Sequence, residues 1–165
     1  MRIEEITENA PFDTTHKWLR EYNSTFVTNK FTPIRLLAYD DDGEVIGSLD
    51  GQIFWGKMHI DNLIVSSRIR KGGTGSLLMK RAEEIAVGHC CTGIYLDTMS
   101  FQALDFYKKM GYCQAGLIEG FENQSTQYFL HKVIQQSHAP DSNSAGLHQA
   151  LVMRGVKHKN KRYDY

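Results

Sequence analysis

The stretch LIVSSRIRKGGTGSLLM, residues 63–79, decides how the chain folds. It opens with three apolar residues typical of a buried strand, continues through a basic loop with three glycines, and ends in apolar residues at helical spacing. A strand followed by a glycine-rich loop and a helix directs backbone N–H groups and the positive helix end at one spot. The sequence therefore predicts a phosphate or pyrophosphate site at this junction.

Two common phosphate loops do not fit the stretch. A Walker A loop requires Lys-Ser/Thr after its last glycine, and none follows Gly75. A dinucleotide fingerprint requires a third glycine where Leu78 stands, although Asp97 does lie about 20 residues on. The pyrophosphate pattern R/Q-x-x-G-x-G/A is met by Arg70, Gly73 and Gly75.

The flanking segments predict a sheet with helices inserted. Upstream, a helix capped by Asp13 or Thr14 is followed by three antiparallel strands, expected at 34–39, 44–54 and 58–65 with a turn at 40–43. Downstream, a helix is expected from Gly73 to Gly88. It is followed by a strand at 94–98, a helix at 102–110 and closing strands at 112–118 and 127–133.

Composition indicates one globular domain. The chain has 165 residues, 41% hydrophobic and 23% charged, and its 19 Lys and Arg balance its 19 Asp and Glu, which argues against a nucleic-acid partner. No apolar run approaches the roughly 20 residues of a membrane span, and the acidic start does not resemble a signal peptide. We therefore expect a soluble cytoplasmic protein without membrane contact. Three cysteines without ligand spacing predict neither a disulfide framework nor a metal site.

The end of the chain differs from its body. Residues 1–134 are expected to form the domain, and residues 135–165 a polar linker and a basic extension with five basic and two acidic residues in 136–165. The apolar residues Leu147, Leu151, Val152 and Met153 could dock on the body or on a second subunit, so a homodimer is one possible assembly.

A second motif lies in YLDTMSFQALDFYKKMGY, residues 95–112, which contains the pattern A-x-x-F-Y-x-K-x-G-Y. Together with the glycine loop it resembles the A and B motifs of the GNAT superfamily of acyl-CoA-dependent N-acetyltransferases, particularly a bacterial subgroup with a B motif similar to SFQAPxFYKKxGY. The resemblance covers roughly residues 34–133. It implies an α/β (α+β) GNAT fold, a mixed, mostly antiparallel sheet of six or seven strands with helices on both faces.

The resemblance also implies acetyl-CoA as cosubstrate. The exposed backbone of Leu63, Ile64 and Val65 would pair with the pantetheine amides, and one N–H would polarise the thioester carbonyl. The remaining cofactor contacts implied by the family are the pyrophosphate loop, formed by Arg70, Lys71, Gly72, Gly73, Thr74, Gly75 and Ser76. Ser100 stands where many members carry an asparagine that bonds the cofactor arm, and its hydroxyl can make some of those bonds.

Tyr107 occupies the family's general-acid position, from which a phenol can protonate the leaving thiolate. A packing role on an amphipathic helix is the alternative. For the base, strand alternation places Asp61 on the face of Leu63, and we choose Asp61; His59 shares that face and is the alternative, as is water.

The resulting hypothesis is a GNAT-type N-acetyltransferase that moves an acetyl group to a primary amine of a small molecule or peptide by direct nucleophilic attack, without metal. Two alternatives are a non-catalytic CoA-binding regulatory or interaction module, and a toxin that acetylates aminoacyl-tRNA. The basic tail favours the tRNA alternative, and the mildly acidic body disfavours it.

Overall fold

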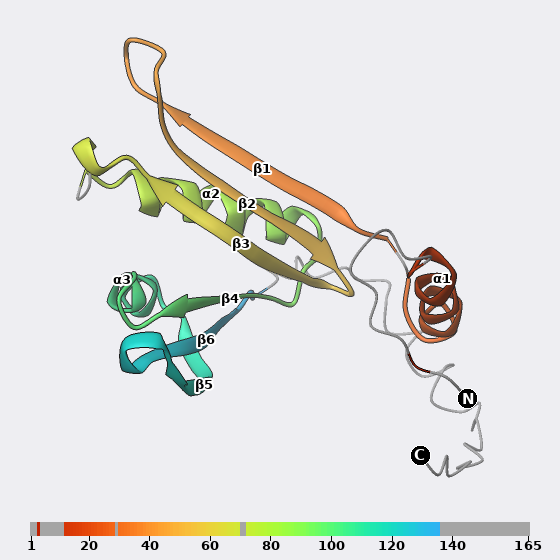
Figure 1. Cartoon of the computed structure of the whole chain (residues 1–165). Helices are drawn as coiled ribbons and strands as arrows, with labels where there is room; N and C mark the ends of the chain where they lie inside the picture. The colour runs from red at the N-terminus through yellow and green to blue at the C-terminus, as the bar shows by residue number, and fades with distance from the viewer. Residues whose placement is uncertain (1–2, 4–11, 29, 70–71, 136–165) are drawn as a thin grey trace.

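The computed structural model describes residue 3 and residues 12–28, 30–69 and 72–135 (Figure 1). Arg70, Lys71 and the extension from residue 136 onward lie outside the described residues. Within the described ranges, no helix has the length and apolar character that a membrane span requires.

Six strands form one sheet in the order β1-β2-β3-β4-β6-β5. All neighbouring pairs are antiparallel except β3 and β4. The prediction of a mixed, mostly antiparallel sheet is therefore confirmed, with six strands in the described part of the chain. The strand bounds are β1 Thr32–Tyr39, β2 Val45–Phe54, β3 Lys57–Val65, β4 Gly93–Met99, β5 Cys113–Phe121 and β6 Ser125–Val133.

The helices are α1 (Phe12–Asn23), α2 (Thr74–Gly88) and α3 (Leu104–Lys109), with two short 3-10 turns at Ser67–Ile69 and Glu122–Gln124. Helix α2 packs along one face of β1 to β4 (Figure 1). Helix α1 begins one residue before the expected cap Asp13 and lies beyond the start of β1 (Figure 1). None of its described side chains belongs to the core cluster. The large apolar side chains Trp18, Leu19 and Tyr22 of this helix are exposed.

The core lies between the sheet and α2. Strand β2 alternates strictly, with its buried positions facing α2 and its half-buried positions on the opposite face. Large side chains that are almost fully buried fill the space between the two layers, and they are Leu49, Met58, Met79, Ile94 and Leu130. Leu104, Phe106 and Tyr107 of α3 join the same cluster, so the sheet, α2 and α3 share one core.

A partly buried ion pair fixes α2 relative to β6 and α3. Glu83 of α2 contacts Lys132 of β6 at 2.8 Å, and the Tyr112 hydroxyl donates to the same carboxylate at 3.3 Å. The Lys132 ammonium also donates to the carbonyl oxygen of Met110 just after α3, at 2.9 Å. Because these bonds satisfy both charges, they orient the end of α3 without leaving a buried charge unpaired.

One extra residue interrupts the pairing of β3 with β2. Asp50 pairs with Asn62 and Gly51 with Ile60, which leaves Asp61 as a bulge. The parallel ladder of β3 with β4 ends at the same place, with Ile60 opposite Leu96, although β3 continues alongside β2 to Val65. A bulge bends the strand that carries it, so β3 and β4 separate beyond Ile60.

Gly51 is required opposite the bulge. A Cβ atom at this position would overlap the carbonyl oxygen of His59, which is backbone and cannot move aside as a flexible side chain could. Gly51→Ala is therefore expected to lower the free energy of unfolding by about 2 kcal/mol, the usual cost of overpacking. Urea denaturation followed by circular dichroism measures this change.

The matched control is Gly116→Ala in β5, where a Cβ atom would meet nothing within 4 Å. We expect this control to change stability by less than about 0.5 kcal/mol, as is usual for open surface positions. Equal effects of the two substitutions would contradict the role of Gly51 at the bulge.

Candidate active site

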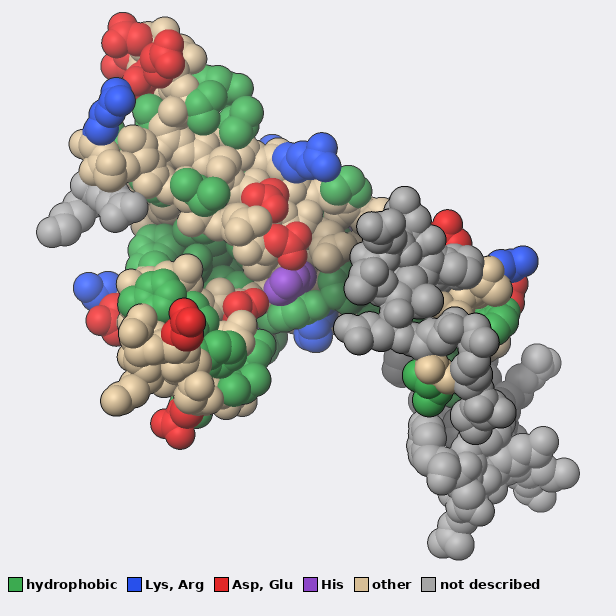
Figure 2. All heavy atoms as spheres, in the orientation of Figure 1, with side chains coloured by type: hydrophobic (Ala, Val, Ile, Leu, Met, Phe, Trp, Pro, Cys, Tyr) green, Lys and Arg blue, Asp and Glu red, His purple; other side chains and the backbone are tan. Residues whose placement is uncertain are grey.

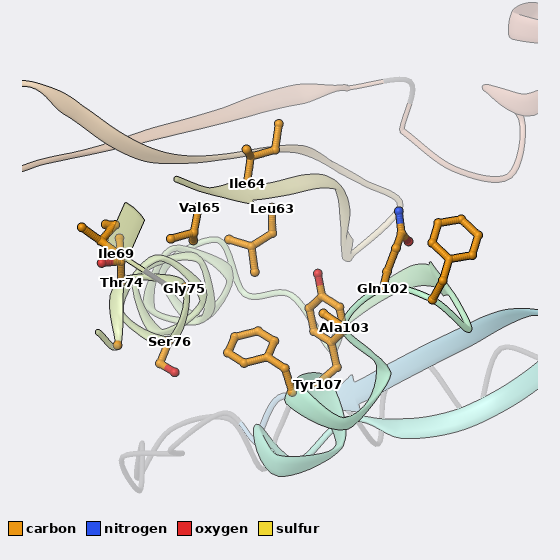
Figure 3. Close-up of a pocket in the computed structure, with 13 residues that line it drawn as sticks. Leu63, Ile64, Val65, Ile69, Thr74, Gly75, Ser76, Gln102, Ala103 and Tyr107 are labelled. Carbon is orange, nitrogen blue, oxygen red and sulfur yellow. The ribbon is translucent and has the colours of Figure 1, made fainter. Parts of the chain in front are cut away.

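A cleft of about 710 Å³ opens where β3 leaves β4, between β3, the start of α2 and α3 (Figure 3). Two sequence segments that are distant in the chain, 63–76 and 101–107, meet there. The cleft is lined by Leu63, Ile64, Val65, Ile69, Gly73, Thr74, Gly75, Ser76, Phe101, Gln102, Ala103, Phe106 and Tyr107. Of the expected cofactor residues in the described chain, only Gly72 and Ser100 do not line it.

The N-terminus of α2 forms one end of the cleft. Gly73 caps the helix with φ 87° and ψ −8°, a left-handed conformation that favours glycine. The Leu77 N–H donates to the Gly73 carbonyl at 3.0 Å, so the N–H groups of Thr74, Gly75 and Ser76 precede the first helical hydrogen bond. These free donors and the helix dipole suit an anion such as a pyrophosphate. Arg70 and Lys71, expected beside it, lie outside the described residues.

Gly75 brings the start of α2 close to α3. A Cβ atom here would lie 3.5 Å from Cζ of Phe106 and 3.6 Å from Cγ2 of Val65, in ordinary van der Waals contact. A larger side chain would project among residues that line the cleft. The glycine therefore keeps this end of the cleft open.

The β3 wall presents backbone groups without a partner strand. Beyond Ile60 no residue of β3 pairs with β4, while β4 continues to pair with β6 up to Met99. Backbone groups alternate along a strand and the Ser66 N–H donates to Ile46 of β2, so Leu63 and Val65 direct their N–H and C=O groups to the side that faced β4 earlier in the strand. An extended ligand with amide groups can bind such an edge as an added strand.

Tyr107 of α3 forms the opposite wall, and its hydroxyl points toward β3 (Figure 3). The residue is 7% exposed, and its ring packs edge-on against Phe106 with 5.1 Å between centroids. Burial raises the pKa of the Tyr107 phenol, and the negative charge of Asp97 raises it further. The phenol is therefore protonated at neutral pH and has a proton to donate.

Ser100, expected to contact the cofactor, does not line the cleft, whereas Gln102 does. The Ser100 hydroxyl accepts the Thr126 N–H at 3.2 Å, which ties the turn to β6. Gln102, two residues on, lines the cleft, and its side-chain oxygen accepts the Met99 N–H at 2.8 Å. The sequence motif contains this glutamine but indicates no role for it, because its position in the cleft depends on how the turn after β4 folds.

His59 and Asp61 lie together at the bulge, on the sheet face opposite α2, and neither lines the cleft. The expectation that they share the face of Leu63 is wrong, because the extra residue shifts the alternation and Leu63 faces the core opposite Leu49. The His59 Nδ1 atom is 2.8 Å from an Asp61 carboxylate oxygen. The imidazole also stacks on Tyr95 of β4, with 4.6 Å between ring centroids and 25° between planes. The carboxylate and the stacked ring together hold the imidazole in one orientation, with Nε2 as its remaining nitrogen.

Two further carboxylates share this open face. Asp50 accepts a hydrogen bond from the Asn62 amide at 3.0 Å, and Asp97 accepts one from the Gln127 amide at 2.7 Å. Neither forms an ion pair with a lysine or arginine of the described chain. Figure 2 shows acidic side chains close to a histidine on this side of the molecule. Three carboxylates thus share this face with His59, and Arg35 of β1 is the cross-strand neighbour of one of them, Asp50.

The described residues contain no group of three or more His, Cys, Asp or Glu side chains arranged to hold a metal ion. The cleft itself offers backbone donors and a protonated phenol, and the His59–Asp61 pair lies in the same strand, before the residues of β3 that line the cleft. This set suits acyl transfer, in which charge develops on an oxygen and protons move between donor and acceptor.

Comparison with known proteins agrees with this chemistry. The sequence model of the acetyltransferase (GNAT) family matches residues 2–112. The chain belongs to the GNAT acetyltransferase family. It is 36% identical over 96 residues to blasticidin-S acetyltransferase of Streptomyces morookaense, a match that covers 58% of this chain and 71% of that protein.

Solved GNAT structures share the fold. A crystal structure of an acetyltransferase from Bacillus cereus superposes with a TM-score of 0.71 at 29% identity, covering 79% of this chain and 97% of that one. A Bacillus anthracis protein solved in complex with acetyl coenzyme A has a TM-score of 0.58 at 23% identity, covering 69% of this chain and 68% of that one. The predicted GNAT fold and its assignment to the acetyltransferases are confirmed.

Proposed function

We propose that this GNAT enzyme transfers an acetyl group from acetyl-CoA to a primary amine of a small cationic molecule by direct nucleophilic attack. The observation that carries the proposal is the cleft itself. It joins the unpaired edge of β3, the free N–H groups of α2 and the buried Tyr107 phenol in one space.

The residues of the cleft fit acetyl-CoA. Free N–H groups of Thr74, Gly75 and Ser76 would bind the pyrophosphate, while the unpaired edge at Leu63 to Val65 would bind the amides of the pantetheine arm. When bound, acetyl-CoA supplies a thioester whose carbonyl carbon is open to attack by an amine. A backbone N–H of β3 next to that carbonyl would stabilise negative charge on its oxygen, an effect commonly worth about 3 kcal/mol.

Tyr107 is the proposed proton donor to the departing sulfur. Its hydroxyl faces β3 across the cleft, and burial holds it in the neutral form. We expect Tyr107→Phe to lower kcat by about 100-fold, the lower range for general acid catalysis, since it removes only the hydroxyl. Release of free CoA measures turnover, and calorimetry measures acetyl-CoA affinity.

The ring of Tyr107 also packs in the core, so a loss of activity must be separated from a loss of structure. The matched control is Tyr128→Phe in β6, outside the lining of the cleft. Both variants are expected to keep the melting temperature and the acetyl-CoA affinity of the wild type. Near-normal turnover in Tyr107→Phe would reduce the residue to a packing role.

The contact between His59 and Asp61 revises the expected base. Because Asp61 accepts from Nδ1 of His59, a neutral imidazole has its Nε2 lone pair free to take a proton from the attacking amine. We therefore propose His59 as the base and Asp61 as the residue that positions it. Asp61 comes two residues before Leu63, which lines the cleft.

Substitutions distinguish the two roles. We expect His59→Gln to lower kcat/KM by about 100-fold and to leave a rate that rises with pH as more amine becomes neutral. Asp61→Asn is expected to cost only about 10-fold, since the asparagine oxygen can still accept from Nδ1. His89→Gln, at the C-terminal end of α2, is the control. A larger loss in Asp61→Asn than in His59→Gln would identify the carboxylate as the base.

The charge of the open face favours a cationic acceptor. Asp50, Asp61 and Asp97 contact Asn62, His59 and Gln127 respectively, and none of the three forms an ion pair with a lysine or arginine of the described chain. Such a face attracts amines that carry a second positive charge. The same charge disfavours an aminoacyl-tRNA, because a polyanion would be repelled.

An amine series tests this acceptor class. With acetyl-CoA present, kcat/KM is expected to rise at least tenfold from butylamine to 1,4-diaminobutane, and Asp50→Asn is expected to remove most of that difference. Asp41→Asn in the turn between β1 and β2 removes the same charge at a remote place and serves as control. Equal rates for both amines would refute the cationic acceptor, and absence of CoA release with every amine would favour a non-catalytic module.

A further inference from the structure

Gln102 is the one amide side chain that lines the cleft, within the described chain. It lies between the end of β4 and the start of α3, beside Phe101 and Ala103. Its side chain projects from the same wall as that of Tyr107 (Figure 3). The function proposed above gives this residue no role.

The orientation of the Gln102 amide is determined by its own turn. The Met99 N–H donates to Oε1 at 2.8 Å, and the Thr98 hydroxyl donates to the same oxygen at 3.3 Å. Since a backbone N–H can only donate, the oxygen must face Met99 and the Nε2 group must face away. Thr98 is 3% exposed, so the turn that holds the oxygen is anchored in the core.

Gln102 can therefore donate a hydrogen bond to a ligand through its Nε2 group. Its Nε2 group has no partner among the described residues, while its oxygen is already shared by two donors. On the opposite wall, β3 presents unpaired backbone groups. A ligand segment between the two walls can accept a hydrogen bond from Gln102 through a carbonyl oxygen while its own amides pair with β3.

We propose that the Gln102 Nε2 group donates a hydrogen bond to an amide carbonyl of the pantetheine arm of acetyl-CoA. The inference rests on the proposed function, because it assumes that acetyl-CoA occupies the cleft. Ser100 is bonded to Thr126 of β6 and lies outside the lining, so Gln102 takes over the cofactor contact expected at Ser100. Gln102 thus binds the pantetheine arm and does not contact the pyrophosphate.

Gln102→Glu removes the Nε2 donor and keeps the oxygen that accepts the hydrogen bonds of the turn. A glutamate oxygen can still accept from Met99 and Thr98, whereas no donor remains in place of Nε2. We expect the affinity for acetyl-CoA to fall tenfold or more. The affinity for 3′-phosphoadenosine 5′-diphosphate, which lacks the pantetheine arm, is expected to change by less than threefold. Isothermal calorimetry measures both.

Two further variants complete the experiment. Gln102→Met removes the donor without adding charge, and we expect the same arm-specific loss. Gln114→Glu in β5 adds the same charge away from the cleft and should change neither affinity. Unchanged acetyl-CoA affinity in Gln102→Glu, or an equal loss for both ligands, would overturn the inference. A wild-type protein that binds 3′-phosphoadenosine 5′-diphosphate and not acetyl-CoA would also overturn it, and failure to bind either would refute the proposed function.

Discussion

The extra residue at Asp61 in β3 is the constraint on which the site depends. A regular β3 would pair with β2 and β4 along its whole length, and all its backbone groups would be satisfied within the sheet. The bulge ends the ladder with β4 at Ile60, while β2 continues to hold β3 to Val65. Separation of the two strands produces both the space of the cleft and the unpaired edge that lines it. Gly51 makes this possible, because only a residue without Cβ fits against the His59 carbonyl.

Helix α3, which forms the wall of the cleft opposite β3, is positioned by polar contacts as well as by packing. Helix α3 has only six residues, too few for a helix that is stable by itself. Phe106 and Tyr107 anchor it in the core, while Lys132 links its end to Glu83 of α2. The Tyr107 hydroxyl therefore faces β3 from a rigid support. Burial of its ring raises the pKa of the phenol, so the packing that positions Tyr107 also keeps its hydroxyl protonated at neutral pH.

The two sheet faces serve different purposes. The face toward α2 is apolar and supplies most of the core, whereas the opposite face carries the carboxylates Asp50, Asp61 and Asp97 beside His59 and Tyr95. Carboxylates without cationic partners repel one another and cost stability.

The sequence by itself determined the fold family, the order of the elements and the glycine-rich start of α2, because these follow from hydrophobic periodicity and from glycines at fixed spacing. It also placed Tyr107 on the helix that lines the cleft. Strand alternation put His59 and Asp61 on the face of Leu63, and this prediction was wrong, because the bulge shifts the alternation and leaves Leu63 opposite the buried Leu49. Only the tertiary structure decided that Asp61 orients His59, that Ser100 bonds β6 and that Gln102 lines the cleft. It also showed that the apolar residues of α1 are exposed. The bulge in β3, the turn after β4 and the position of α1 depend on contacts between distant segments. Local sequence patterns contain no information about such contacts.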